Sequence, residues 1–168
     1  MATTTTINPD KDTYVWEGAP TINYGTQTTV RLGAIYSHGA ASPYNVVMEF
    51  DVSGYTDPSG IVSANLTLTH ISDSGAVNNT VTVRRLDSVF VESGGDGCTW
   101  NKPDDGEATT WDGGEDNAIT NVPDVQFTVG VDSDDTTIDI SKFLVDAIQR
   151  RSGVLRLVFF MTAAATAT

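Results

Sequence analysis

Acidic side chains are concentrated in one glycine-rich stretch of the sequence, residues 92–116. Carboxylate and carbonyl oxygens are the ligands that Ca²⁺ prefers, and acids spaced closely in a loop can converge on one ion. This stretch lacks the ligand spacing of an EF-hand, so we favour a solvated acidic loop and keep a calcium site as the alternative. The candidate calcium ligands are Asp104, Asp105, Glu107, Asp112 and Asp116.

The tryptophans and several tyrosines are the second set of side chains suited to a ligand. Flat aromatic rings pack on the C–H faces of sugars and lose little conformational entropy in doing so. Aromatic residues on strands usually belong to the core instead, and this alternative applies to Trp16 and Trp100. The candidate glycan-binding residues are Trp111, Trp100 and Tyr44, and we expect Trp111 to be the most exposed of them.

Motifs of known catalytic sites are absent from the sequence. It contains no G-x-S-x-G, H-E-x-x-H, paired C-x-x-C or Walker-type phosphate loop. His38 and His70 are far apart, and the acids near Cys98 disfavour its thiolate, so we interpret Cys98 as a spectator or a small buried apolar group. We therefore predict no catalytic residue and no cofactor other than the possible calcium, which argues against an enzyme.

Short runs with alternating apolar and polar side chains predict a series of β-strands. In residues 64–70, Ala64, Leu66 and Leu68 face one way and the residues between them face the other, as in half-buried antiparallel strands. The predicted strands are Tyr14–Trp16, Thr28–Gly33, Val46–Val52, Ile61–Ile71, Thr80–Leu86, Val125–Val131, Thr136–Ile140 and Val154–Met161.

One short helix is predicted near the C-terminus. Ser141 would cap its first turn, apolar residues recur on one stripe, and Arg150 and Arg151 in the last turn precede Gly153. Many short strands with one small helix predict an all-β fold, namely an antiparallel β-sandwich of jelly-roll type.

Composition limits the possible organisation and partners. A chain of 168 residues with 39% hydrophobic residues is large enough for one packed domain, which we place at residues 12–168 after a flexible or partner-bound tail at residues 1–11. The net charge of −13 argues against nucleic acid, anionic membranes and acidic polysaccharides, because those partners require clustered Lys and Arg. We expect no signal peptide and no membrane span.

Taken in order, several short motifs resemble the DNRLRE-domain family of β-sandwich modules across roughly residues 12–161. They are Asp12-x-Tyr14-Val15, Asn23-Tyr24-Gly25, Leu32-Gly33, Phe50-Asp51-Val52-Ser53, Ala64-x-Leu66-x-Leu68, Val81-x-Val83-x-Arg85, Val91-Glu92, Thr99-Trp100 and Ile138-Asp139-Ile140-Ser141. The resemblance implies that Asn23-Tyr24-Gly25 is a fixed turn before the second strand. It also implies that Glu92 is a structural carboxylate that accepts hydrogen bonds from backbone N–H groups.

Two departures from the family pattern bear on function. The family tends to place basic residues just before its Phe-Asp pair, and this chain has none at residues 45–49, which argues against an acidic glycan. The family also closes with a further strand after an Ala/Ser-rich connection. This sequence ends at residues 163–168, where that connection would begin, so a neighbouring molecule would supply the strand unless the chain is truncated.

Members of the resembled family are surface modules of extracellular enzymes, filaments and virions, and two hypotheses follow. The first is a non-enzymatic structural or interaction protein, a bacteriophage-type virion decoration or fibre protein assembled in the host cytoplasm. It would form homo-oligomers on a larger shell or surface protein. The alternative is an extracellular or cell-surface carbohydrate-binding module, or an adhesin domain, that recognises neutral glycans. A lyase or hydrolase is a third class, but acids in a glycine-rich loop lack the rigid support that catalysis requires.

Overall fold

The computed structural model describes residues 3–37, 40–71, 79–104, 111–115, 118–119, 122–129 and 135–161. Its main layer is a seven-stranded antiparallel sheet in which β1, β3, β9 and β5 lie side by side in that order. Strands β6 and β7 both pair with β5, and β2 pairs with the first part of β3. The strands are β1 (Lys11–Trp16), β2 (Gly33–Ser37), β3 (Ala40–Asp51), β5 (Asn79–Leu86), β6 (Ala118–Ile119), β7 (Val125–Val129) and β9 (Val154–Met161).

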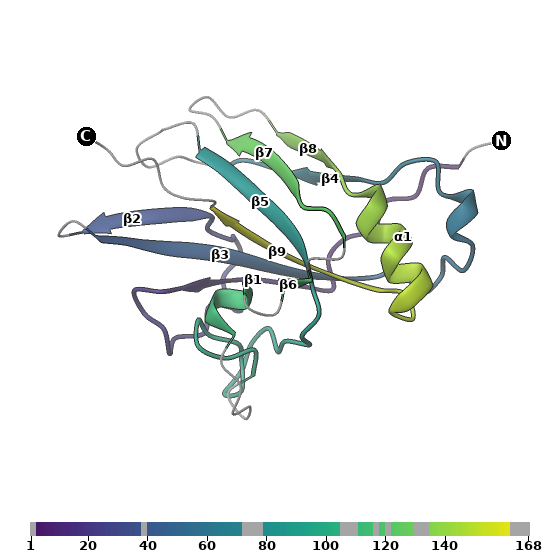
Figure 1. Ribbon diagram of the computed structural model, residues 1–168. Helices are drawn as coiled ribbons and strands as arrows, with labels where there is room; N and C mark the ends of the chain where they lie inside the picture. The colour runs from purple at the N-terminus through teal and green to yellow at the C-terminus, as the bar shows by residue number, and fades with distance from the viewer. Residues whose placement is uncertain are drawn as a thin grey trace.

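A second, two-stranded antiparallel sheet lies over one face of the main sheet. It pairs β4 (Asn65–Leu68) with β8 (Thr136–Asp139), and α1 (Ser141–Arg150) follows directly. The remaining elements are two short 3-10 helices, η1 (Pro58–Gly60) and η2 (Asp112–Gly114). Within the described residues the fold is thus an all-β, antiparallel sandwich with a single short α-helix near the C-terminus, as predicted (Figure 1).

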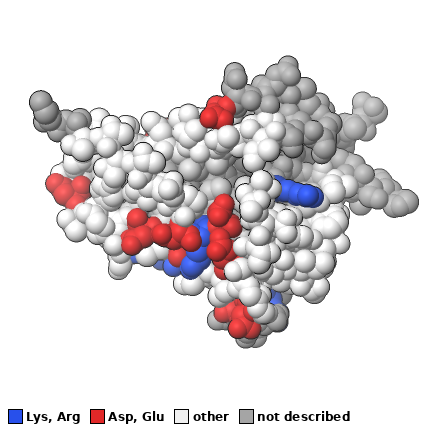
Figure 2. Space-filling model, turned by 180° about the vertical axis from the view of Figure 1, so that it is seen from behind, with Lys and Arg blue, Asp and Glu red and all other residues white. Residues whose placement is uncertain are grey.

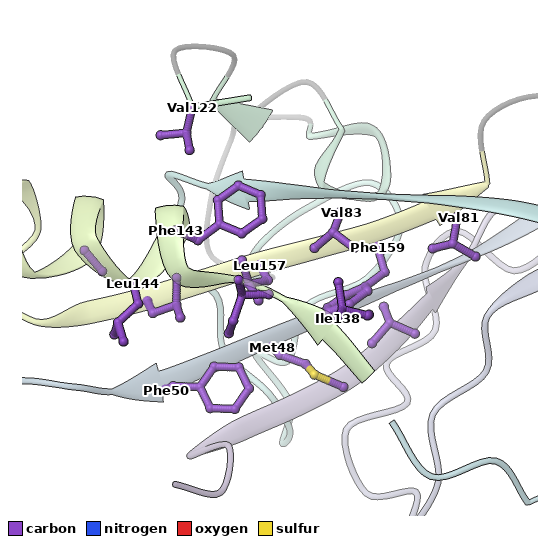
Figure 3. Close-up of a cluster of buried hydrophobic side chains, with 14 of the residues drawn as sticks. Met48, Phe50, Val81, Val83, Val122, Ile138, Phe143, Leu144, Leu157 and Phe159 are labelled. Carbon is purple, nitrogen blue, oxygen red and sulfur yellow. The ribbon is translucent and has the colours of Figure 1, made fainter. Parts of the chain in front are cut away.

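Both faces of the main sheet are buried. Successive residues of a strand point to opposite faces, so Val46 and Met48 face β4 and β8 while Val47 faces away. We call the first the inner face; its core includes Met48, Phe50, Val81, Val83, Ile138, Phe143, Leu144, Leu157 and Phe159 (Figure 3). The opposite, outer face carries a separate outer cluster of Val15, Val47, Leu86, Phe90, Cys98, Trp100, Trp111, Val158 and Phe160.

Different kinds of structure cover these two faces. Regular elements, the β4–β8 sheet and α1, cover the inner face, whereas the irregular chain around η2 lies on the opposite side of the main sheet (Figure 1). The predicted long loop at residues 92–116 is thus, where the structure describes it, a cover over a second core. Buried side chains such as Cys98 and Trp111 come from it.

The predicted Thr28–Gly33 strand is wrong. Residues 28–32 are not paired in a ladder, and the strand β2 begins at Gly33 instead. Val30 and Leu32 do pack against the inner core, so their alternation reflects burial without strand pairing. The Ile61–Ile71 strand is shortened to Asn65–Leu68. The other predicted strands occur, although Gly130 and Val131 lie outside the described residues.

The helix begins where predicted but is capped differently. Ser141 is its first residue, and its Oγ accepts a hydrogen bond at 2.8 Å from the N–H of Ala64, which ties the helix to β4. Asp139 Oδ1 accepts the N–H of Ser141 at 2.9 Å, so an aspartate satisfies one of the free donors of the first turn. Gly153, with φ of 78°, terminates the helix as predicted and donates to Ala147 O.

Candidate functional site

The two tryptophans predicted to bind sugar lie in the outer cluster, and Trp111 is fully buried. Its Nε1 donates to Thr99 O at 2.7 Å, and its ring lies 6.5 Å from that of Phe90. Trp100 is 6% exposed, and its Nε1 donates to Asp112 Oδ1 at 3.0 Å. The expected exposure of Trp111 is therefore wrong, because both indoles are hydrogen-bonded into the core that the loop covers. Their contact with sugar stays a prediction.

Tyr44 lies on the other face of the main sheet, in a group of four rings. We call Tyr14, Trp16, Tyr24 and Tyr44 the aromatic cluster. Tyr14 stacks on Tyr24 with ring centroids 4.5 Å apart, and Trp16 stacks on Tyr44 at 5.2 Å. Tyr14 meets Tyr44 edge-on at 5.8 Å and joins the two pairs. The structure thus separates Tyr44 from Trp100 and Trp111 and joins it to three other aromatic residues.

The aromatic cluster combines a buried base with partly exposed members. Tyr14 and Tyr44 are 3% and 6% exposed, whereas Trp16 and Tyr24 are half-buried. Half-buried rings held by stacked partners present fixed apolar surface at little entropic cost, which is the property that sugar stacking needs. Trp16 and Tyr24 are therefore the partly exposed members of the aromatic cluster, and Gly18 also packs against the Trp16 ring, where a Cβ would lie 2.5 Å from Cε2 and Cζ2.

Polar groups around the rings add hydrogen-bonding capacity. The guanidinium of Arg31 lies 5.9 Å from the ring centroid of Tyr14. The buried Nε1 of Trp16 has no hydrogen-bond acceptor among the described residues, although a buried indole N–H usually has one. Burial raises the pKa values of Tyr14 and Tyr24, so both phenols stay protonated and can donate as well as accept hydrogen bonds at neutral pH.

The turn at Asn23-Tyr24-Gly25 holds the cluster in place. Asn23 Oδ1 accepts the N–H of Gly25 at 3.2 Å, so the turn is closed by a bond from a side chain to the backbone. Asn23 Nδ2 also donates to Glu92 O and Cys98 O, each at 2.8 Å. A Cβ at residue 25 would overlap Glu92 O, so Gly25 is required for close approach of two backbones rather than for a positive φ. This linkage to residues 92–98 fixes Tyr24 beside Tyr14.

Glu92 has the structural role that the resemblance implied. Its Oε1 accepts the backbone N–H of Asp12 in β1 at 2.8 Å. Burial raises the pKa of Asp12, and the nearby Glu92 carboxylate raises it further. Burial likewise raises the pKa of Cys98 to about 12, so this thiol is the inert, buried apolar group that the sequence suggested.

The acidic loop is described in part. Asp105, Glu107 and Asp116 lie outside the described residues, and Asp104 is half-buried. Asp112 adopts φ of 45° and accepts the indole N–H of Trp100. Within the described ranges, no three His, Cys, Asp or Glu side chains come together as a metal site would require. The calcium site stays a prediction.

The sequence does not predict that Tyr14, Trp16 and Tyr24 converge. A signal was present, since Tyr14 and Trp16 are two residues apart and so must share one face of a strand. The approach of Tyr24 depends on the contact between Asn23 and residues 92–98. That contact spans about seventy residues of sequence, and no local pattern indicates it.

The face of the molecule opposite to that in Figure 1 is mostly uncharged where it is described, and acidic side chains gather beside a few basic ones at its centre (Figure 2). None of the helices within the described residues is long and apolar enough to cross a membrane.

Comparison with known proteins gives one positive result. The model of carbohydrate-binding module family 96 matches residues 3–157, and no curated protein matches the chain. The family match supports the carbohydrate-binding alternative of the sequence analysis; it supports neither the virion role nor the DNRLRE assignment. Because the match spans nearly the whole sequence, the chain belongs to carbohydrate-binding module family 96.

Proposed function

We propose that this chain is a non-catalytic, extracellular or cell-surface module that binds a neutral glycan through the exposed parts of Trp16 and Tyr24. The observation that carries the proposal is the family match over residues 3–157. Modules of this kind are typically non-catalytic and deliver their specificity through a small number of aromatic and polar contacts. The aromatic cluster would offer such contacts through its two half-buried rings, those of Trp16 and Tyr24.

Charge supports a neutral ligand. The chain carries a net charge of −13, so a polyanionic glycan would be repelled at long range. Arg31 contacts the aromatic cluster, but one guanidinium does not offset that repulsion along a polymer. Neutral sugar rings, with apolar C–H faces and hydroxyl edges, match stacked rings whose phenols donate and accept hydrogen bonds.

Affinity electrophoresis in gels that contain xylan, glucomannan or a mixed-linkage β-glucan tests the proposal, with alginate and pectate as acidic counterparts. We expect retardation by at least one neutral polysaccharide and a weaker effect of the acidic ones. Trp16→Ala and Tyr24→Ala should each weaken binding about tenfold, equivalent to about 1.4 kcal/mol, because each removes a stacking surface.

The matched control is Tyr55→Ala. Tyr55 is also a half-buried tyrosine packed against the inner core, but it lies outside the aromatic cluster. Thermal unfolding of all three variants shows whether a loss of binding merely follows a loss of folding. Binding that survives both Trp16→Ala and Tyr24→Ala would place the site elsewhere, and no retardation by any polysaccharide would refute the proposed function.

A further inference from the structure

Asp12 lies on the same face of β1 as the aromatic cluster. Alternate residues of a strand share a face, so Asp12 points to the inner side of the main sheet with Tyr14 and Trp16, whereas Val15 points to the outer cluster. The Cα atoms of two such neighbours, Asp12 and Tyr14, are about 7 Å apart along an extended strand. A carboxylate therefore lies beside the ring on which Tyr24 is stacked.

Glu92 joins Asp12 to the turn that carries Tyr24. Its Oε1 accepts the backbone N–H of Asp12 at 2.8 Å, and its backbone O accepts a hydrogen bond from Asn23 Nδ2 at 2.8 Å. A Cβ at residue 25 would overlap this same carbonyl oxygen, so the backbone of the turn is in close contact with that of residue 92. Asp12 and Tyr24 are thus both held against Glu92, and the same contacts fix their relative position.

The carboxylate of Asp12 is half-buried, and among the described residues neither of its oxygens accepts a hydrogen bond or pairs with a cation. Burial raises the pKa of Asp12, and the neighbouring Glu92 carboxylate raises it further. Glu49, a half-buried acid of the adjacent strand, is bonded instead to Lys11 and Arg156. A partly desolvated carboxylate without a donor costs stability, and such uncompensated groups are concentrated at functional sites.

The charges around the aromatic cluster favour a ligand that donates hydrogen bonds and carries no negative charge. Asp12 and Glu92 contribute two carboxylates, against the single guanidinium of Arg31 over the ring of Tyr14. An ionised carboxylate only accepts hydrogen bonds, through two oxygens, and charge-assisted bonds of this kind are stronger than those between neutral groups. Sugar hydroxyls donate such bonds, whereas the carboxylate of an acidic sugar would be repelled.

We propose that Asp12 is a specificity-determining residue of the aromatic cluster, whose carboxylate accepts hydrogen bonds from adjacent hydroxyls of a neutral sugar ring that rests on Tyr24. This inference rests on the proposed function, because it assigns a further residue to the same site. It defines the ligand as a ring with free hydroxyls at the Asp12 side, and it makes the exclusion of acidic sugars a local property of the site. The stability lost to an unpaired carboxylate is then a cost of binding function.

Partial O-methylation of the ligand tests this contact directly, because it removes hydroxyl donors and leaves the C–H faces in place. Affinity electrophoresis compares xylan, glucomannan and mixed-linkage β-glucan with their O-methylated derivatives. Asp12→Ala should weaken binding of the unmodified polymer about tenfold. Methylation should weaken binding by the wild type strongly and binding by Asp12→Ala much less, because the variant has already lost the contact. Asp12→Asn should bind alginate and pectate better than the wild type does.

The matched control is Asp57→Asn. It removes one negative charge from an exposed residue that caps η1, where asparagine can replace aspartate, so it should leave the binding of all these polymers unchanged. Thermal unfolding separates binding from folding. Asp12→Asn should be at least as stable as the wild type, because the wild-type carboxylate has no partner among the described residues to lose.

The outcomes separate this inference from the proposed function. Binding that Asp12→Ala leaves unchanged, or an effect of methylation that is equal in the wild type and Asp12→Ala, refutes the role of Asp12 and leaves the proposed function intact. A lower melting temperature for Asp12→Asn would show that the carboxylate stabilises the fold, which overturns its assignment to the ligand. If Asp12→Asn binds acidic polymers no better than Asp57→Asn does, the local exclusion of acidic sugars is refuted. A wild-type chain that binds none of the polysaccharides refutes the proposed function itself.

Discussion

The two faces of the main sheet are covered in different ways. On the inner face, β4, β8 and α1 bury Phe143, Ile138 and their neighbours through regular elements. On the outer face, residues from 86 to 111 bury Phe90, Cys98 and both loop tryptophans without a strand or α-helix of their own in the described part. Each cover encloses side chains that are less than 1% exposed, so an irregular cover buries its core as completely as a regular one.

What differs is the way that each cover meets its backbone hydrogen-bonding requirement. Strands β4 and β8 bond to each other in a regular ladder, and α1 forms its hydrogen bonds within itself. The outer cover combines irregular backbone bonds, such as Cys98 N–H to Val91 O and Gly113 N–H to Trp100 O, with bonds from single side chains. Asn23 donates to two of its carbonyls, Asn45 donates to Gly113 O at 3.2 Å, and Trp111 donates to Thr99 O. Losing one such side chain leaves buried carbonyls unsatisfied, so the outer cover should be the more sensitive of the two to single polar substitutions.

The largest expected effect comes from emptying the outer cluster. Trp111→Ala removes a fully buried ring, and substitutions of this kind cost about 3–5 kcal/mol. Trp111→Phe keeps most of the volume but leaves Thr99 O without its donor, at a cost of about 1–3 kcal/mol. Urea unfolding followed by circular dichroism measures both. Phe143→Ala is the counterpart on the inner face, because Phe143 is also fully buried, and its cost should be similar.

If Trp111→Ala lowers the free energy of unfolding only slightly while Phe143→Ala lowers it strongly, the outer cover does not unfold cooperatively with the sheet. The two faces would then differ in folding as well as in construction. Equal losses, with a single transition in each case, would show that the irregular cover folds together with the sheet.

The same difference decides what could be predicted from the sequence. Alternation along β3, β5 and β9 indicated the strands, and the spacing near Ser141 indicated α1, because those elements are periodic and local. The outer cover has no period, so its acidic and glycine-rich composition was interpreted as a solvated loop, although Trp111 within it is fully buried. Within the candidate site, the two-residue spacing of Tyr14 and Trp16 predicts that both side chains lie on one face of a strand. The approach of Tyr24 was not predicted, because it depends on a long-range contact of Asn23.

Asn23→Ala should have the next largest effect. It removes the donor to Glu92 O and Cys98 O, and buried carbonyls without a partner cost about 1–3 kcal/mol. Amide hydrogen exchange locates the damage: protection at residues 91–98 should fall, while protection in α1 and β8 should not. Because Asn23 also positions Tyr24, glycan binding should weaken in parallel. Equal loss of protection in α1 would show that the two covers are not independent.

The smallest expected effect is a change in acid stability at the edge of the outer cover. Glu49 lies in the outer face of β3 between Lys11 of β1 and Arg156 of β9, and both cations bond to it. Lys11 Nζ also donates to Phe90 O at 3.3 Å and lies over the Phe90 ring, so this charged row joins the sheet to the cover. Burial raises the pKa of Glu49, but the bonds from Lys11 and Arg156 outweigh it and hold the pKa below its ordinary value of 4.5.

A carboxyl group whose pKa is lower in the folded state than in the unfolded state stabilises the fold at pH values above its unfolded-state pKa. That contribution is lost as the pH falls through its folded-state pKa. Wild-type chain should therefore be more stable than Glu49→Gln at pH 7, and the difference should shrink as the pH falls below 4.5. Urea unfolding at a series of pH values measures it. A difference that stays constant would mean that Glu49 acts through packing. The Asp146–Arg85 pair on the inner face is present in both the wild type and Glu49→Gln, so its pH dependence cancels from the comparison. The pH dependence that remains reports on the outer cover alone.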